Sequence, residues 1–252
     1  MLERRVRNIA MLQFRRRDGL SGGDFGWLKA RHHFKVTPQG DPAHGPLGAL
    51  VVWNDDEIAP GAGFDLHGHK DMEIIAYVRE GAVTHRDTIG GLGRTEAGDV
   101  QVMSAGTGIR HAEHNRGEVP LKLFQIWLSP RTSGGRPDWS SRKFPKADRA
   151  GQLVTLASGD SRDVDALPIR ADARVLGATL MPGDAVSYDL AEGRYAYLAP
   201  ARGVVAVNGQ RLETGDGVAA IFERRLDIRA EEAAEIVLVD TSPAPGAGKA
   251  EP

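Results

Sequence analysis

The sequence predicts an all-β fold of two domains, each closed as a sandwich or barrel. First, the 31 glycines and 14 prolines recur at short intervals, with short apolar or alternating runs between them. Runs of about four to eight residues bounded by turn residues are typical of strands. Second, no long segment keeps a helical period, and third, the turn residues of the first half recur in the second.

The expected strands follow from these runs in chain order. Each run is rich in valine, isoleucine, leucine or aromatic residues, which fit a pleated and partly buried surface. The runs are GALVVW (48–53), EIIAYV (73–78), DVQVM (99–103), LKLFQIWL (121–128), GVVAV (203–207) and EIVLVD (235–240).

An internal repeat organises these strands. Gly81 follows Pro60-Gly61 at the same distance at which Gly203 follows Pro182-Gly183. A glycine turn comes next in each half, TEAGDV in the first and LETGDG in the second. Equal spacing of turn residues predicts the same hairpins twice, and therefore two β domains related by duplication.

The domain boundary is expected in the polar segment 129–151. We predict an N-terminal metal-binding domain over residues 1–135 and a C-terminal domain without the metal site over 136–241. The last segment, 242–252, is rich in proline, glycine and alanine, and we expect it to be disordered.

Composition excludes several functions. Of the 252 residues, 41% are hydrophobic and 26% charged, and the formal charge is −2, so we expect neither nucleic acid nor membrane as partner. We expect a monomer in the cytoplasm. The chain has no cysteine, which excludes disulfides, thiolate ligands and cysteine nucleophiles, so any metal must be held by nitrogen and oxygen.

Two short motifs suggest that metal. His67 and His69 are separated by Gly68, and His111 and Glu113 have the same one-residue gap. Because residues i and i+2 of a strand point to the same face, each pair projects together. If the two strands lie across a barrel, three imidazoles and one carboxylate converge, a set that suits Fe(II), Mn(II), Ni(II), Co(II) or Zn(II). The alternative is that the histidines are ordinary surface or hydrogen-bonded residues.

The other histidines are expected to have lesser roles. His85 is expected on a solvated strand face, and His32 and His33 could line the mouth of the site or pack behind it. The second half contains no histidine after His114 and therefore cannot carry a histidine site. Counting from the repeated turns, His67, His69, His111 and Glu113 correspond to Asp189, Ala191, Ile228 and Ala230.

The block HGHKDMEIIAYVREGAVTHRD, followed by AGDVQVMSAGTGIRHAEHN, resembles the pirin family of the cupin superfamily, especially its bacterial quercetinase-type members. The resemblance implies two cupin jelly-roll domains, a bicupin, with Fe(II) in the first; Zn, Ni, Mn, Co or Cu could substitute. It implies His67, His69, His111 and Glu113 as ligands. It leaves Glu73, often a ligand in other cupins, out of the set.

The resemblance leaves two kinds of function open. One is a dioxygenase resembling quercetin 2,3-dioxygenase, which cleaves a flavonol-type ring with O₂ and uses Glu113 as both ligand and base. The other is a non-catalytic iron-binding regulator that binds a protein partner. A storage-type cupin is a weak third option, because it needs no ligand set. A cavity large enough for a flavonol would favour the enzyme.

Overall fold

The computed structural model describes residues 10–36 and 40–243, and their fold is all-β with two cupin domains, as predicted. Four sheets account for nearly all of the regular structure, with short 3-10 turns at Arg17–Gly19, Pro42–His44 and Lys146–Arg149. Most of the predicted disordered tail lies outside the described residues. In the described part of the chain, no helix has the length and apolar character needed to cross a membrane.

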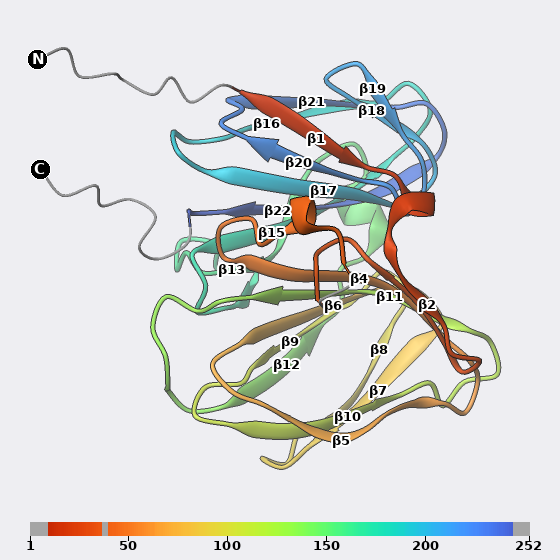
Figure 1. The fold of residues 1–252 in the computed structure, drawn as a ribbon, viewed down its shortest axis with the longest axis vertical. Coiled ribbons are helices and arrows are strands. Elements are labelled where there is room, and N and C mark those ends of the chain that lie inside the picture. The colour runs from red at the N-terminus through yellow and green to blue at the C-terminus, as the bar shows by residue number, and fades with distance from the viewer. Residues whose placement is uncertain (1–9, 37–39, 244–252) are drawn as a thin grey trace, which may run out of the picture.

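The first cupin consists of a seven-stranded and a four-stranded sheet (Figure 1). The large sheet has the order β12 (Asp138–Arg142), β9 (Val100–Ser104), β6 (Glu73–Glu80), β11 (Leu121–Leu128), β4 (Leu50–Ile58), β3 (Leu28–His32), β2 (Ser21–Asp24). The small sheet has the order β5 (Gly63–His69), β10 (Ile109–His114), β7 (Ala82–Asp87), β8 (Leu92–Glu96).

The second cupin repeats this arrangement. Its large sheet has the order β1 (Met11–Arg15), β20 (Gly217–Ile221), β17 (Tyr195–Arg202), β22 (Ala234–Thr241), β15 (Ala173–Leu180), β13 (Val154–Ser158), β14 (Leu167–Pro168). Its small sheet has the order β16 (Ala185–Asp189), β21 (Arg225–Ala230), β18 (Val205–Val207), β19 (Gln210–Leu212).

The two large sheets correspond in strand order, although the β13–β14 pair is parallel and its counterpart β3–β2 is antiparallel. Each sheet takes one edge strand from outside its own run of strands. The edge strand β1 precedes the first cupin in the chain but pairs with β20 of the second. The edge strand β12 follows β11, the last of the other strands of the first cupin, and pairs with β9. Strand pairing therefore crosses the predicted boundary at residue 135 in both directions, and the boundary itself stays a prediction.

The repeated turn residues have the same backbone conformation. Gly81 has φ +72° and Gly203 has φ +75°, in the left-handed region that favours glycine. A Cβ on Gly81 would lie 2.9 Å from the carbonyl oxygen of Pro120, and one on Gly203 would lie 2.2 Å from that of Ala233. Both positions therefore require glycine for two reasons, which explains the equal spacing seen in the sequence.

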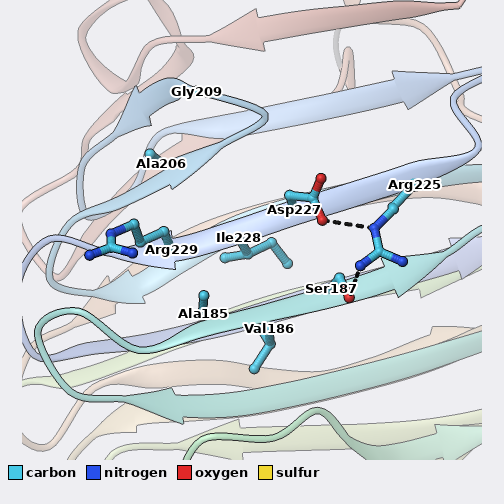
Figure 2. Close-up of a pocket in the computed structure, with 9 residues that line it drawn as sticks. All are labelled: Ala185, Val186, Ser187, Ala206, Gly209, Arg225, Asp227, Ile228 and Arg229. Atoms are coloured by element: carbon cyan, nitrogen blue, oxygen red, sulfur yellow. Dashed lines mark hydrogen bonds and ion pairs between the residues drawn. The ribbon is translucent and has the colours of Figure 1, made fainter.

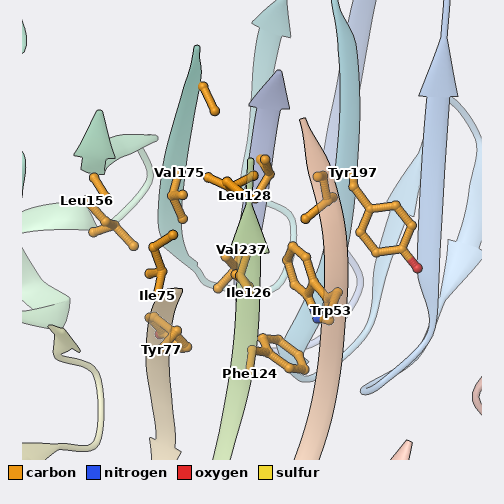
Figure 3. Close-up of a cluster of buried hydrophobic side chains, with 14 of the residues drawn as sticks. Trp53, Ile75, Tyr77, Phe124, Ile126, Leu128, Leu156, Val175, Tyr197 and Val237 are labelled. Atoms are coloured by element: carbon orange, nitrogen blue, oxygen red, sulfur yellow. The ribbon is translucent and has the colours of Figure 1, made fainter. Parts of the chain in front are cut away.

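The main core lies between the two cupins. It combines first-half side chains such as Trp53, Ile75 and Phe124 with second-half side chains such as Val175 and Val237, all fully buried (Figure 3). The two large sheets thus share one apolar layer, and each cupin is left with a separate interior between its own large and small sheets.

These two interiors differ. The interior of the second cupin is filled by one large apolar cluster that includes Leu198, Leu226 and Ile228. The first cupin has two small apolar clusters, one around Val83 and Leu123 and one around Met103 and Ile109. Between them lies a polar cavity, described next.

Candidate metal centre

The two histidine motifs lie on neighbouring strands of the small sheet. His67 and His69 are on β5, His111 and Glu113 are on β10, and His67 is paired directly with His111. A bulge between His111 and Glu113 shifts the register, so that Glu113 pairs with Phe64. The two motif strands are neighbours and do not lie across a barrel from each other, the arrangement under which the sequence predicted convergence. Adjacent pairing also brings the imidazoles together.

Three imidazoles converge in the first cupin. One ligand atom from each of His67, His69 and His111 lies within 4.8 Å of the others. Their ring centroids are 4.9 Å (His67–His69), 4.5 Å (His67–His111) and 5.1 Å (His69–His111) apart. Such convergence of three lone-pair donors is the arrangement that a divalent metal ion requires.

The hydrogen bonding of these rings leaves nitrogens free for a metal. Nδ1 of His67 donates to the carbonyl oxygen of Asp65 at 2.7 Å, which leaves its Nε2 as the lone-pair donor. Within the described residues, Nε2 of His69 and both ring nitrogens of His111 are buried without a hydrogen-bond partner. Buried polar atoms are normally satisfied, so these nitrogens fit a site built for an ion.

The protonation states also fit. Burial, and then the neighbouring His67, lowers the pKa of His69 to about 4. Burial, and then His67, His69 and His85, lowers the pKa of His111 to about 3. Both rings are therefore neutral near pH 7, which is the form that binds a metal.

Glu113 lies deeper than the three imidazoles. It forms a second group with His85 and His111, whose ligand atoms also lie within 4.8 Å of one another, and does not join the group of three histidines. Its Oε1 accepts from Nε2 of Gln101 and its Oε2 from Nε2 of Gln125, each at 2.5 Å. Burial raises the pKa of Glu113 to about 7, against the opposing effect of these two amides.

The expectation of a solvated His85 was wrong. The side chain is fully buried, and its ring stacks on Trp139 with centroids 4.6 Å apart and planes 6° from parallel. Its Nε2 donates to Oδ2 of Asp87 at 2.9 Å, and its ring lies 5.4 Å from that of His111. Trp139 belongs to β12, so the cover over His85 comes from a strand that the sequence did not assign to this cupin.

The remaining candidates lie away from this cavity. His33 is fully buried between the cupins, where its Nδ1 is 2.8 Å from the hydroxyl of Tyr197. Glu73 accepts hydrogen bonds through Oε2 from Ser104 Oγ at 2.6 Å and from the backbone N–H of Arg170 at 3.0 Å. Neither side chain lines the cavity that contains the three imidazoles.

That cavity has a volume of about 100 Å³. Sequence analysis missed one of its walls, which the large sheet contributes through Asn54 and Asp56 on β4 and Gln125 and Trp127 on β11. The available signal was weak: polar residues 54–57 interrupt the apolar strand β4, and Gln125 is a single polar residue within the apolar run 123–128. Burial, then Asp55 and Glu113, raises the pKa of Asp56 to about 8.

A larger hollow of about 430 Å³ lies over the small sheet of the second cupin (Figure 2). Most of its lining side chains are exposed, and Arg225 is already bonded to Asp227 at 2.8 Å and Ser187 at 2.6 Å. Because this surface is open and Arg225 is already paired, the hollow lacks the buried, convergent lone-pair donors that the first cupin has.

The second cupin has no counterpart of the ligands. His114 pairs with Gly63 in the first cupin, and Arg229 pairs with Ala185, the residue equivalent to Gly63, in the second. By this register, Leu226 is the residue equivalent to His111, and Ile228 is the residue equivalent to Glu113. Each lies two positions earlier in the chain than the residue that the sequence count gave. The loop before the strand is shorter in the second cupin, and the count could not allow for that.

Comparison with known proteins also distinguishes the two cupins. A family model described as Pirin matches residues 13–128, and one described as Quercetinase C-terminal cupin domain matches residues 155–241. A "Pirin-like protein" of Caulobacter vibrioides is 58% identical over 89% of this chain and 97% of its own length. A protein of Escherichia coli named "Quercetin 2,3-dioxygenase" is 37% identical over 92% of this chain and 100% of its own length.

A solved structure with a similar fold contains a metal. The crystal structure of the bacterial pirin YhhW from Escherichia coli in complex with nickel(II) superposes with a TM-score of 0.85 at 35% sequence identity. The match covers 92% of this chain and 100% of that one. Together with the converging imidazoles, this supports a divalent metal in the present chain.

Proposed function

Since this chain belongs to the pirin family of bicupins, we propose that it is a metal-dependent dioxygenase resembling quercetin 2,3-dioxygenase, acting on a flavonol-type enol. The observation that carries the proposal is the convergence of His67, His69 and His111 in a cavity of the first cupin. The named relatives support the reaction type. The compartment that we propose is the cytoplasm.

We propose His67, His69, His111 and Glu113 as the ligands of one metal ion per chain. When bound there, a divalent metal would supply Lewis-acid polarisation that makes a substrate hydroxyl more acidic. Fe(II) is the proposed ion, and nickel, present in the relative's structure, is a plausible replacement because the affinity order places it above iron. The second cupin, with Leu226 and Ile228 in the equivalent positions, would hold none.

Glu113 would take the proton from the substrate hydroxyl. A pKa of about 7 suits a base at neutral pH, because the carboxylate is then both present and basic enough to accept a proton. The amides of Gln101 and Gln125 fix both of its oxygens, and each oxygen keeps further lone-pair capacity for a ligand or a proton. Trp127, at the cavity edge beside His69, would exclude water from one side.

The test is anaerobic reconstitution with each candidate metal, followed by oxygen uptake with quercetin. We expect one tightly held ion per chain, and His111→Ala should lose both metal and activity. His114→Ala is the matched control, because His114 is on the same strand but points to the opposite face. Two tightly held ions per chain, or full metal content in His111→Ala, would contradict the proposed ligand set.

One observation favours the second candidate, a non-catalytic iron-binding regulator. A volume of about 100 Å³ is below the roughly 300–1,000 Å³ of cavities that enclose whole drug-sized ligands, so a flavonol could enter only in part. Fully metallated protein that consumes no oxygen with any flavonol would favour this candidate over the enzyme.

A further inference from the structure

The wall of the cavity opposite the histidine strands consists of hydrogen-bond acceptors. In the part of the chain that the structure describes, three side-chain oxygens on this wall are buried without a donor: Oδ1 of Asn54, Oδ1 of Asp56 and Oε1 of Gln125. Asn54 and Gln125 are direct cross-strand partners, and Asp56 is two residues from Asn54 on the same face. The three oxygens therefore form one continuous patch.

The orientation of this patch is set by its neighbours. Because Nε2 of Gln125 donates to Glu113, the free end of that amide is its acceptor oxygen. Nε1 of Trp127 lines the same cavity as a buried donor and has no acceptor among the described residues. Facing the three imidazoles there are thus three acceptors and one donor, all without partners among residues 10–36 and 40–243.

Buried polar atoms of this kind are normally satisfied by ordered water or by a ligand. The part of a ligand that displaces such waters must fit a cavity of about 100 Å³, and it must carry donors for the acceptor patch and an acceptor for Trp127.

We propose that Asn54, Asp56 and Gln125 form a recognition patch for a compact enediol with an adjacent carbonyl, which would be the substrate class of this site. One enol oxygen would face the imidazoles, the neighbouring hydroxyl would donate to the patch, and the carbonyl would accept from Trp127. This inference rests on the proposed function, because it assumes an enol oxygen at the metal.

The chemistry of Asp56 supports this assignment. Its side chain is 2% exposed, and its Oδ1 has no hydrogen-bond donor among the described residues, so a ligand hydroxyl is the kind of group that this oxygen needs. A site that hydrogen-bonds a substrate hydroxyl discriminates strongly against an analogue without it, since the buried protein atoms then stay unpaired.

Two small probes test the proposal on the zinc-loaded protein, in which no oxidation occurs. They are 2,3-dihydroxycyclopent-2-enone and 2-hydroxy-3-methylcyclopent-2-enone, in which a methyl group replaces one enol hydroxyl. The quantity to measure by calorimetry is the ratio of their dissociation constants. Comparing this ratio among variants removes the intrinsic difference between the probes in their affinity for metal.

We expect Asp56→Leu and Asn54→Leu each to reduce the preference for the dihydroxy probe by about tenfold, the usual effect of one good hydrogen bond to a buried partner. Asp56→Asn keeps an acceptor and should retain most of the preference. Thr179→Val is the matched control, because it removes a buried oxygen that also has no partner among the described residues, but in the second cupin.

A ratio unchanged within about twofold in both leucine variants would overturn the proposal and leave the patch as a water site. If Asp56→Leu does not fold or retain zinc, Asn54→Leu decides by the same criterion. Failure of the proposed function would look different. The wild-type protein would still bind the dihydroxy probe more tightly than the methyl probe, but no metal form would consume oxygen with quercetin or the dihydroxy probe.

Discussion

Glu113 is the residue whose surroundings most restrict its chemistry. Its two oxygens accept from amides on different strands, Gln101 on β9 and Gln125 on β11. Gln101 is itself held, because its Oε1 accepts from Oγ1 of Thr95 at 3.0 Å. These contacts form a chain of donors that stabilises the ionised carboxylate, while burial favours the neutral acid.

Replacing Glu113 with glutamine should therefore do more than remove a charge. The new amide would place an N–H group against the N–H donors of Gln101 or Gln125. We expect metal affinity to fall at least tenfold, and turnover at equal metal occupancy to fall by the roughly 10²–10⁴-fold typical of a lost base. Glu118→Gln, on an exposed loop, is the control and should match the wild type in both measurements.

The comparison must use oxygen uptake with metal content measured on the same samples, because partial loading would imitate loss of the base. A fully metallated Glu113→Gln protein with wild-type turnover would remove Glu113 as the base. The proton would then have to pass to solvent.

Residue patterns paired the histidines of the candidate site. The i, i+2 rule placed His67 with His69 and His111 with Glu113, and the structure brings the three imidazoles together but leaves Glu113 outside that group. The other half was missed because Asn54 and Asp56 face the histidines only through the closure of the barrel. That contact depends on how two sheets pack, which no local pattern encodes.

At the scale of elements, β12 lies in the segment that connects the two cupins, and it also packs beside the candidate metal centre. Its Trp139 covers the ring of His85, and beneath Trp139 lies Gly93 of β8. A Cβ at Gly93 would lie 2.3 Å from Cη2 of Trp139, so only glycine leaves room for the indole there. The sequence signal was limited to a glycine within a short strand, which is typical of close approach by another group.

Substitution of Gly93 with alanine tests this packing. The methyl group should push Trp139 away from His85 and lower the free energy of unfolding by about 1–3 kcal/mol, the usual cost of overpacking. Gly19→Ala is the control, since a Cβ there meets no atom within 4 Å. Urea unfolding of the metal-free proteins measures both changes, and equal midpoints for Gly93→Ala and the wild type would contradict the packing role.

Strand positions were predicted more reliably than strand partners. The run 121–128 coincides with β11 (Leu121–Leu128), and 73–78 lies within β6 (Glu73–Glu80). The edge strand β1 lies in the arginine-rich start of the chain and joins a sheet about 200 residues away, pairing Met11 with Ile221. Edge pairing of this kind is set by the finished sheet, so the sequence of the strand alone could not reveal it.

At the scale of the whole molecule, the two cupins are joined through a core that contains a polar group. His33 is fully buried there, and its Nδ1 lies 2.8 Å from the hydroxyl of Tyr197 in the other cupin. The buried Arg15 of β1 donates to the carbonyl oxygen of His33 at 2.5 Å and lies over the ring of Phe34. The second cupin therefore supports the first through this shared layer, while its own interior is filled mainly by packed apolar side chains.

This arrangement predicts how stability depends on pH. Burial, and then the charges of Arg15 and Arg79, lowers the pKa of His33 to about 3, against about 6.5 in the unfolded chain. Between these values the unfolded state binds a proton that the native state does not. Stability is therefore fully present above about pH 6.5 and falls as pH decreases, by up to about 1.4 kcal/mol per pH unit from this one group.

Replacing His33 with asparagine isolates the effect. The amide can still bond to the hydroxyl of Tyr197 but does not titrate, so the variant should lose less stability between pH 7 and pH 5 than the wild type. Urea unfolding with the metal removed from both proteins is the measurement, because His69 and His111 then contribute equally to each. Above about pH 7.5 the imidazole is neutral in both states, so the difference between the two curves should become constant. Parallel curves from pH 7 to pH 5 would mean that His33 becomes protonated without leaving the shared core, and the tight joining of the two cupins inferred from its burial would be wrong.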